Sequence, residues 1–568
     1  MDGSDWARMT ITSRVIHWPP AIAKLRSYQL SWLRGDLVAG ATVTAYLVPQ
    51  VMACAMLAGM PPLTALWGAA LAQIAYILFG TSSRLSVGPE SSTALLTGTV
   101  LIPVAGGDIA LHHALAAVLA GIVGLICLVA SLARLGFLAN LLSRPILIGY
   151  ITGIAAVMLI GQIGAFTAVE LPDERITTVS QAIPEVARGF HTPTLILAVS
   201  VLCLLFAFDK WAPKLPGPAI AVVAATALVS WKSDWFRGTK SLQSVPEPMQ
   251  SLGFPHVSSG HLSALVLPAI GISIVAFSDA VLTARAFAAR DDAELDPNIE
   301  LRALGIANAA AGLVHAFPVS ASATRTGLAR AVGGKTQLYS IIVVLMVSAV
   351  ALFGRNILSH IPVAVLGALV VYAAVRMIDV AQYRRLARFR RSELVLACAT
   401  TLAVLGFGVL NGVLVAVGLS IFDLLRRIAH AHDSVLGFVP GLAGMHDLND
   451  YATAAPLPGL VVYRYDAPLC FANAQDFHKR ALAAVDSTDG HVEWFILNAE
   501  ANVEVDLTAL DALDQLREDL AQRGIVLVIA RVKQHLRDAL AAAGLLSRIG
   551  EDRIFPTLPT AVDAFEHR

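Results

Sequence analysis

Charged side chains are scarce in this sequence of 568 residues. Asp, Glu, Lys and Arg together make up 14% of the chain, whereas soluble domains carry about 25%. Lys and Arg total 41, as do Asp and Glu, so the net charge is zero and the sequence lacks the basic surface that a nucleic-acid partner requires. Hydrophobic residues account for 56%. This balance predicts a protein that is embedded largely in a lipid bilayer.

Cysteine is also scarce. The five cysteines form no Cys-x-x-Cys pair and no spacing typical of a metal site, which argues against a disulfide framework or a metal centre; they are Cys54, Cys127, Cys203, Cys398 and Cys470. We therefore expect no cofactor. The C-terminal region lacks a nucleophile–base set and a phosphate-binding loop, so the sequence does not predict an enzyme.

Long apolar runs extend along the chain up to residue 430. A helix needs roughly 20 residues to cross the hydrocarbon, and short joints with Arg, Gly or Pro separate the runs. We count about eleven or twelve spans, and short or interrupted candidates raise the number to about fourteen. The run 394–425 is long enough for two shorter spans that meet near residues 406–412. Other clear runs are 37–59, 114–133, 194–208, 262–282 and 338–354.

Basic residues occupy every second joint between these runs. Arg84, Arg134 and Lys210 lie in such joints, and the joint 376–391 is the richest in arginine. The positive-inside rule places these joints in the cytoplasm. With an even number of spans, the sequence predicts that both termini are cytoplasmic and that the protein lies in the cell membrane.

The C-terminal region has a different pattern. Strand-like runs alternate with amphipathic helical runs, in the order 460–463, 473–485, 494–497, 508–522, 525–529 and 532–543. This alternation is typical of a sheet covered by helices, that is, a soluble α/β domain. We expect four parts: a cytoplasmic N-terminal segment 1–36, a transmembrane domain 37–430, a Gly- and Pro-rich linker 431–457 and the α/β domain 458–568.

Two segments interrupt the apolar pattern, Ser86–Thr93 and Phe317–Thr326. Each has a proline near its start and then small hydroxyl residues. Proline suits the first turn of a helix, so we expect half-helices that begin inside the membrane; ordinary loops are the alternative. The N–H groups and positive dipole ends of half-helices form an anion site built from backbone. The segments lie about 230 residues apart, in matching places of two halves, as an inverted repeat predicts.

Several motifs, in order along the chain, resemble the SulP sulfate-permease family. The run 48–62 is similar to the family's first span, 86–89 to its third and 317–326 to its tenth, while 458–568 resembles the STAS domain that closes most members. The resemblance covers nearly the whole chain. It implies a membrane α-helical fold with fourteen spans as two inverted seven-span repeats, divided into core and gate domains. It also implies an elevator-type movement of the core and a homodimer.

The same resemblance places the substrate between the two half-helices, against the first span. Cys54 stands where the family often has an aromatic residue, which makes the pocket wall smaller. Arg325 would supply positive charge, although a structural brace is its alternative role. The expected substrate-binding residues are Gln50, Cys54, Glu90, Ser91, Ser320, Ala321, Ser322, Thr324 and Arg325.

Two acidic residues are candidates for ion coupling. Glu90 either caps a half-helix or repels the anion until it is protonated, which would couple proton uptake to anion uptake. Asp279 and Thr283 lie one turn apart on one helix face. Their oxygens suit Na⁺, as the resemblance to bicarbonate-transporting members implies. Otherwise Asp279 is a counter-ion for Arg325, a proton carrier or a structural residue.

The expected function is secondary active transport of a small inorganic anion, with sulfate as the first choice and H⁺ as the coupling ion. Sodium-coupled bicarbonate transport and an uncoupled channel or exchanger are the alternatives. Glu90 favours coupled transport, because a passive anion pore has no use for an acidic residue at its anion site. Arg325 argues against a nucleobase permease on the same fold, since such sites use acids to bind neutral rings.

The STAS-like region offers a test for regulation. In soluble relatives a phosphorylatable serine follows an aspartate at the start of a helix, but here Leu507 follows Asp506. The usual phosphorylation switch is therefore absent. Asp506 and the adjacent Thr508 remain candidate regulatory residues, with an ordinary role for Thr508 at a helix N-terminus as the alternative.

Overall fold

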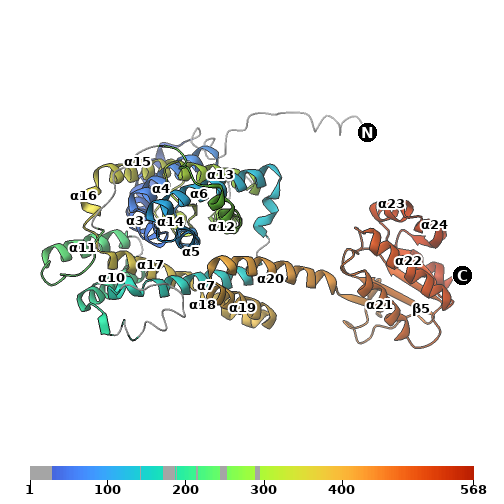
Figure 1. The fold of residues 1–568 in the computed structure, drawn as a ribbon. Coiled ribbons are helices and arrows are strands. Elements are labelled where there is room, and N and C mark those ends of the chain that lie inside the picture. The colour runs from blue at the N-terminus through green and yellow to red at the C-terminus, as the bar shows by residue number, and fades with distance from the viewer. Residues whose placement is uncertain are drawn as a thin grey trace. The chain divides into compact units, whose positions relative to one another are not determined.

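The structure is a computed structural model that describes residues 28–140, 143–169, 184, 186, 188–212, 215–242, 252–287 and 295–568. Most of the predicted segment 1–36 lies outside the described residues. The chain divides into two compact units, Met1–Ser420 and Ile421–Arg568, with the boundary inside the last helix of the helical part, α20 (Val409–Ala429). The first is built from helices, and the second contains a sheet with helices packed on it (Figure 1).

The first half of the helical unit contains η1 (Leu30–Trp32), α3 (Leu33–Leu57), α4 (Pro62–Phe79), β1 (Val87–Gly88), α5 (Ser91–Ala105), α6 (Ile109–Leu132), η2 (Leu135–Asn140), α7 (Arg144–Gly161), α8 (Ile163–Thr167), α10 (Thr192–Trp211) and α11 (Gly217–Trp231). The second half contains α12 (Ser259–Phe287), α13 (Pro297–Leu313), β2 (Ser320–Ala321), α14 (Ala323–Ala331), α15 (Leu338–Phe353), α16 (Arg355–Leu358), α17 (Val363–Met377), α18 (Val380–Phe389), α19 (Arg391–Phe407) and α20 (Val409–Ala429).

The two halves repeat the same packing. Helices α3, α4, α5, α6, α7, α10 and α11 correspond in order to α12, α13, α14, α15, α17, α19 and α20. Their contacts correspond as well: α6 packs on α13 as α15 packs on α4, α3 touches α14 as α12 touches α5, and α7 packs on α19 as α17 packs on α10. The predicted arrangement of two inverted seven-span repeats is confirmed.

Local sequence explains several helix ends and contacts. Prolines start α4, α7, α10, α11 and α13 within their first two positions, where the missing N–H costs nothing. The run 394–425 breaks at Gly408, whose φ of 84° favours glycine, so this run forms two helices that meet where the sequence predicts. Between α6 and α13, a β-carbon added at Gly124 would lie 2.7 Å from the carbonyl oxygen of Gly305, so small residues bring these helices together.

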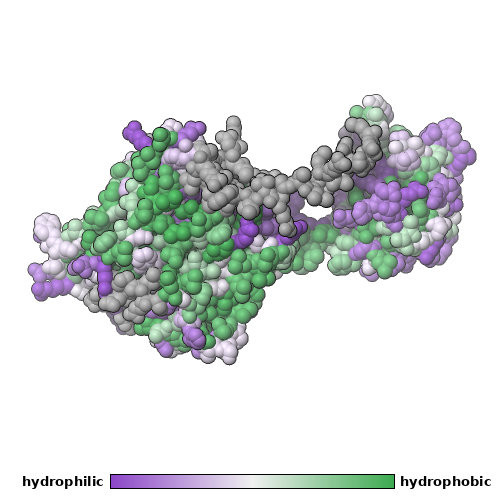
Figure 2. All heavy atoms as spheres, turned by 90° about the horizontal axis from the view of Figure 1, so that it is seen from above, coloured by the Kyte–Doolittle hydropathy of each residue, from purple (hydrophilic) through white to green (hydrophobic). Residues whose placement is uncertain are grey.

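Among the described residues, seven helices are long and apolar enough to cross a membrane, and three apolar helices of 10–17 residues accompany them. Figure 2 shows hydrophobic residues over much of the surface of the helical unit, and many hydrophilic residues on the second unit. The helical unit therefore presents to its surroundings the kind of surface that lipid tails cover.

The second unit is an α/β domain with a six-stranded sheet in the order β4-β3-β5-β6-β7-β8. Strands β5 to β8 run parallel, and β3 pairs antiparallel with both β4 and β5. Apolar side chains pack helices α21 to α24 on one face of the sheet and α25 on the other. The elements are β3 (Asp433–Phe438), β4 (Met445–Asp447), β5 (Leu460–Tyr465), α21 (Ala474–Asp486), β6 (Trp494–Asn498), α22 (Leu507–Gln522), β7 (Val526–Ala530), α23 (Gln534–Ala542), α24 (Leu545–Ile549), η3 (Glu551–Arg553), β8 (Ile554–Phe555) and α25 (Leu558–Glu566).

All six predicted strands and helices of this domain are present, but the predicted linker 431–457 differs from the expectation. It contributes β3 and β4 to the sheet, because Asp433–Phe438 pairs along β5 despite the glycine at position 437. The hydroxyl of Tyr463 on β5 donates to Asp433 Oδ2 at 2.9 Å. Burial, together with the charge of Asp433, raises the pKa of Tyr463 above its usual range.

Candidate anion site

The two broken segments meet as a pair of short strands. Val87 pairs with Ala321 and Gly88 with Ser320, antiparallel, and a helix starts within three residues of each strand. The N–H of Ser322 also donates to the carbonyl oxygen of Ser86, at 2.9 Å. Both half-helices, α5 and α14, therefore begin at the same place inside the helical unit, as the sequence predicts.

Two buried amides hold these strands in place. Gln73 on α4 accepts from the N–H of Val87 at 2.8 Å. Asn308 on α13 accepts from the N–H of Val319 at 2.9 Å and donates to the carbonyl oxygen of Val319 at 3.1 Å. Because α4 and α13 are repeat-related, each half uses an amide on its second helix to satisfy backbone groups in its short strand or directly before it.

Arg325 on α14 is the centre of the polar contacts between the half-helices. Its side chain is 0% exposed. Its Nε donates to Ser86 Oγ at 3.2 Å, and its Nη1 donates to the carbonyl oxygen of Pro89 at 2.9 Å and to Gln50 Oε1 at 3.3 Å. Glu90 Oε2 lies 3.5 Å from Nη1. One nitrogen, Nη2, is buried and has no partner among the described residues, so Arg325 retains hydrogen-bonding capacity.

Glu90 stands at the N-cap position of α5 but does not cap it. Its two carboxylate oxygens instead accept from Gln50 Nε2, both at 3.4 Å. Its side chain is 20% exposed, so the acid is open to a proton or an ion. The capping interpretation is therefore wrong, and no side chain in the described part of the protein caps the first turn of α5.

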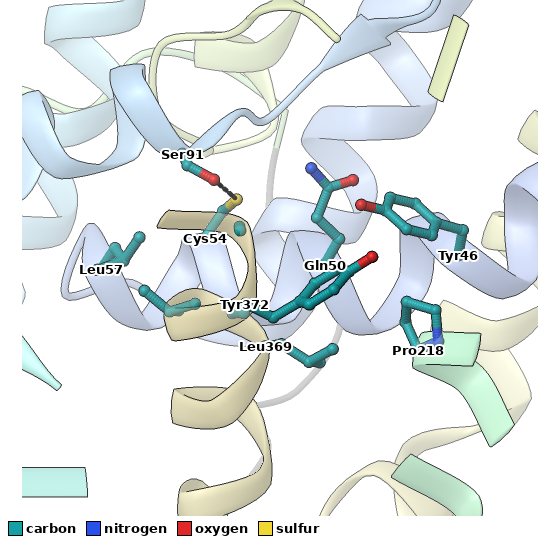
Figure 3. A pocket seen from close by; sticks show the side chains of 11 residues that line it. Tyr46, Gln50, Cys54, Leu57, Ser91, Pro218, Leu369 and Tyr372 are labelled. Atoms are coloured by element: carbon teal, nitrogen blue, oxygen red, sulfur yellow. Dashed lines mark hydrogen bonds between the residues drawn. The ribbon is translucent and has the colours of Figure 1, made fainter. Parts of the chain in front are cut away.

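A pocket lies next to this network, between α3, α5, α11 and α17. Of the predicted substrate-binding residues, Gln50, Cys54 and Ser91 line it, and Cys54 Sγ lies 3.8 Å from Ser91 Oγ (Figure 3). Figure 3 also shows the polar ends of Tyr46, Gln50 and Tyr372 gathered on one side. The remaining lining is apolar and consists of Ala53, Leu57, Pro218, Leu369, Val370 and Ala373.

The other predicted residues lie beside the pocket and do not line it. Arg325 reaches it through Gln50, which it contacts directly. Ser320 Oγ donates to the carbonyl oxygen of Ala276 at 3.1 Å, and Ser322 Oγ accepts from the N–H of Arg325 at 3.4 Å. Ala321 is buried in β2, and Thr324 is exposed in the first turn of α14.

Comparison with known proteins identifies the family of this chain. Residues 33–400 match the sulfate permease family, and residues 451–561 match the STAS domain. A protein of Mycobacterium tuberculosis named "Probable sulfate transporter" is 58% identical over 551 residues, which cover 97% of this chain and 98% of that protein. The chain belongs to the sulfate permease family.

More distant matches agree. "Sulfate transporter 4.1, chloroplastic" of Arabidopsis thaliana is 28% identical over 98% of this chain and 84% of its own length. The murine Solute Carrier 26 family member A9 anion transporter, in the inward-facing state, has the same fold, with a TM-score of 0.88 at 20% identity over 100% of this chain and 98% of that chain. The transmembrane domain of the cyanobacterial bicarbonate transporter BicA matches 69% of this chain and 98% of its own, with a TM-score of 0.60 at 21% identity.

The second candidate ion site of this family member lies on α12. Asp279 Oδ2 accepts from Ser92 Oγ, in the first turn of α5, at 3.3 Å. Thr283 is buried one turn further along α12. The ion pair that the structure gives Arg325 is with Glu90, so the interpretation of Asp279 as its counter-ion is wrong. Within the described part of the chain, no cluster of three or more His, Cys, Asp or Glu residues could hold a metal ion.

Sequence reasoning missed four residues of the site. Tyr46 and Tyr372 line the pocket, and Gln73 and Asn308 hold the half-helix strands. Tyr46 precedes Gln50 by one helical turn, so it shares a helix face with a residue already selected. Gln73 and Asn308 are amides inside apolar spans, and polar residues in such spans mark functional positions. The apolar run around Tyr372 gives no comparable signal.

In the STAS domain, Asp506 is the N-cap of α22. Its Oδ1 accepts from the N–H of Ala509 at 2.9 Å, and its Oδ2 accepts from the N–H of Phe471 at 2.6 Å. Leu507 and Thr508 are exposed in the first turn. Asp506 thus has a structural role, and a regulatory role for either Asp506 or Thr508 stays a prediction.

Proposed function

We propose that this protein is a secondary active transporter that carries sulfate across the cell membrane together with protons. The observation that carries the proposal is the contact of buried Arg325 with Glu90 and Gln50, beside the uncapped start of α5. The name of the 58% identical relative supports sulfate as the anion. A dianion suits amide donors, hydroxyl donors and a single arginine.

Glu90 is the proposed coupling group. While its carboxylate is ionised, it neutralises Arg325 and repels an incoming anion. A proton on Glu90 removes that negative charge, so that Arg325 and the first-turn amides of α5 attract the substrate. Proton uptake then precedes or accompanies anion binding.

The proposed movement is of the elevator type. Gln50, Glu90 and Arg325 belong to the core helices α3 to α6 and α12 to α15, whereas Pro218 and Tyr372 belong to the gate helices α11 and α17. A shift of the core past the gate would carry the anion with it and expose it on the other side. The proposal further includes a homodimer, cytoplasmic termini and a transmembrane domain over residues 37–430.

Sodium-coupled bicarbonate transport is the second candidate, and one observation favours it. Asp279 is hydrogen-bonded to Ser92 in the first turn of α5 and lies one turn from Thr283, so its carboxylate is next to the substrate site. A Na⁺ held there would add positive charge near the anion.

Uptake of labelled sulfate and, separately, of labelled bicarbonate into proteoliposomes, with an imposed pH gradient and with or without Na⁺, separates the two candidates. The proposal expects uptake driven by the pH gradient, and expects Glu90→Gln to lose its pH dependence while Asp279→Asn keeps it. Uptake in Glu90→Gln that still rises with the pH gradient contradicts the role of Glu90. Bicarbonate uptake that needs Na⁺ and is lost in Asp279→Asn, without sulfate uptake, establishes the second candidate instead.

A further inference from the structure

The gate side of the pocket carries a second pair of an arginine and an acid. Tyr372 of α17 lines the pocket, and Arg376 follows it by one turn of the same helix. Arg376 Nη1 forms an ion pair with Asp209 Oδ1 on α10, and it donates to the hydroxyl of Tyr372 at 3.5 Å. The guanidinium carbon lies 5.9 Å from the centre of the Tyr372 ring.

This pair differs from Arg325 and Glu90 in its exposure. The side chains of Arg376 and Asp209 are 48% and 38% exposed, whereas that of Arg325 is fully buried. The Arg376 side chain is therefore accessible one helical turn from the pocket-lining Tyr372. Phe206 of α10 packs edge-on against Tyr372, with ring centres 5.2 Å apart, and so holds the tyrosine in place beside the arginine.

The pocket lies between the partners of the two arginines. Arg325 touches Gln50, Gln50 and Tyr372 line the same pocket, and Tyr372 accepts from Arg376. An anion that leaves Arg325 on the gate side thus meets a phenol hydroxyl and then a planar guanidinium. A guanidinium presents a fork of N–H donors that matches an oxyanion.

We propose that Tyr372 and Arg376 form a second anion-binding position on the gate side of the pocket, and that Asp209 competes with the anion for Arg376. The inference rests on the proposed transport function and adds a residue that determines affinity. Asp209 keeps the position neutral when no anion is present, because a half-exposed charge at the end of a span is stabilised by an opposite charge. The incoming anion displaces that carboxylate.

The two halves of the pair then have opposite effects, which a purely structural brace would not have. Arg376→Gln removes the anion contact and should raise the KM for sulfate about tenfold, with a change in maximal rate of less than about twofold. Asp209→Asn frees Arg376 and should lower the KM about threefold, in keeping with the modest strength of exposed ion pairs. Arg376→Lys keeps the positive charge but loses the paired N–H donors of the guanidinium. Its KM should lie between that of the unaltered protein and that of Arg376→Gln.

The test measures labelled sulfate uptake into proteoliposomes, and equilibrium binding of labelled sulfate to the full-length protein in detergent. Arg384→Gln is the matched control, since Arg384 is an exposed arginine of α18 and its loss changes the net charge equally. Its KM should equal that of the unaltered protein. The double variant Arg376→Gln/Asp209→Asn should resemble Arg376→Gln alone, because Asp209 acts only through Arg376.

Two results overturn the inference in distinguishable ways. If the unaltered protein transports sulfate but Arg376→Gln and Asp209→Asn raise the KM alike, or leave it unchanged, Arg376 is a brace between α10 and α17 and the inference is wrong. If the unaltered protein neither binds nor transports sulfate, the proposed function fails and the inference fails with it. Thermal unfolding of each variant in detergent shows that it is folded before its KM is used.

Discussion

The two half-helices share a scaffold but differ in chemistry. Strands β1 and β2 pair with each other, and each is held by an amide from the second helix of its own repeat, Gln73 or Asn308. Their helix starts are not alike. Helix α5 begins at Glu90 without a side-chain cap, whereas α14 begins at Ser322, whose hydroxyl accepts from the N–H of Arg325.

This difference assigns separate tasks to the two repeats. Helix α5 starts without a side-chain cap, and Ser91 in its first turn lines the pocket. The capped start of α14 contributes its arginine, which turns away from its own helix to reach Pro89, Gln50 and Glu90. Symmetric packing thus places an asymmetric set of charges at the centre of the helical unit. In the proposed function, α5 supplies most of the donors and α14 supplies the positive charge.

The largest effect should follow from loss of Arg325. Arg325→Gln leaves Glu90 without its cation in a buried network, and removing one partner of a buried ion pair costs about 3 to 5 kcal/mol. We expect sulfate uptake to fall by about a hundredfold or more, and the free energy of unfolding in detergent to fall by that amount. Arg330→Gln, on the exposed face of the same helix, is the control and should leave both unchanged.

A double variant separates stability from transport at this position. Arg325→Gln/Glu90→Gln removes both charges, so much of the stability should return while uptake stays lost, since no cation is left for the anion. Recovery of uptake in the double variant would show that Arg325 serves only to neutralise Glu90. The supposed division of tasks between α14 and α5 would then be wrong.

The next effect tests whether Gln73 and Asn308, the two amide braces of the short strands, contribute equally to stability. Asn308→Ala leaves both the N–H and the carbonyl oxygen of Val319 without that partner, at about 1 to 3 kcal/mol for each unsatisfied group. Gln73→Ala leaves the N–H of Val87 without that partner. The other two bonds of Gln73 are long, at 3.4 Å to Leu85 O and 3.5 Å from Ser86 Oγ, and Leu85 O still accepts from Gln337 Nε2 at 3.1 Å.

We therefore expect Asn308→Ala to lower the free energy of unfolding by about 3 kcal/mol and Gln73→Ala by about half as much. Thermal unfolding of the purified variants measures both values. The exposed Asn411 of α20 provides a matched control, Asn411→Ala, with little expected change. Equal losses at the two braces would mean that the second bond of Asn308 contributes nothing.

These braces also mark the limit of what the sequence predicts. Pro89 and Pro318 with their hydroxyl neighbours locate both half-helices, because proline and free helix starts are local features. The pairing of Val87 with Ala321 joins strands of two residues each, which leave no periodic pattern to read. The sequence also does not predict the direction of the Glu90 side chain. From the N-cap position this side chain can turn either to its own helix or to Gln50.

The STAS domain shows the same contrast. Its core strands are continuous apolar runs and were predictable, while β3 lies in a stretch whose glycines and prolines indicate a linker. Strand β3 is stabilised by its partner β5, a contact between chain segments that local composition does not encode. Tyr372 of the pocket is a comparable case, since only the packing of α17 against α3 brings it to Gln50.

A moderate effect should follow from filling the space beside α5. Cys54 Sγ lies 3.8 Å from Ser91 Oγ and lines the pocket, so Cys54→Phe would place a ring against the open helix start. Overpacking of a fitted site costs about 1 to 3 kcal/mol, and we expect the KM for sulfate to rise about tenfold. Cys54→Ala keeps the space open and should change the KM by less than about twofold. A Cys54→Phe variant with unaltered KM would move the substrate away from α5.

The smallest effect should distinguish the two helix starts directly, through the matched changes Ser322→Ala and Ser91→Ala. The bond that Ser322 Oγ accepts from Arg325 N is long, at 3.4 Å, so its loss should cost at most about 1 kcal/mol. The N–H of Ser322 still donates to Ser86 O at 2.9 Å, and the N–H of Thr326 to Ser322 O at 3.0 Å, so α14 keeps its place. We expect Ser322→Ala to shift the KM by less than about twofold, and Ser91→Ala to raise it about threefold because Ser91 faces the pocket. A larger change in Ser322→Ala than in Ser91→Ala would make α14, and not α5, the open end that meets the anion.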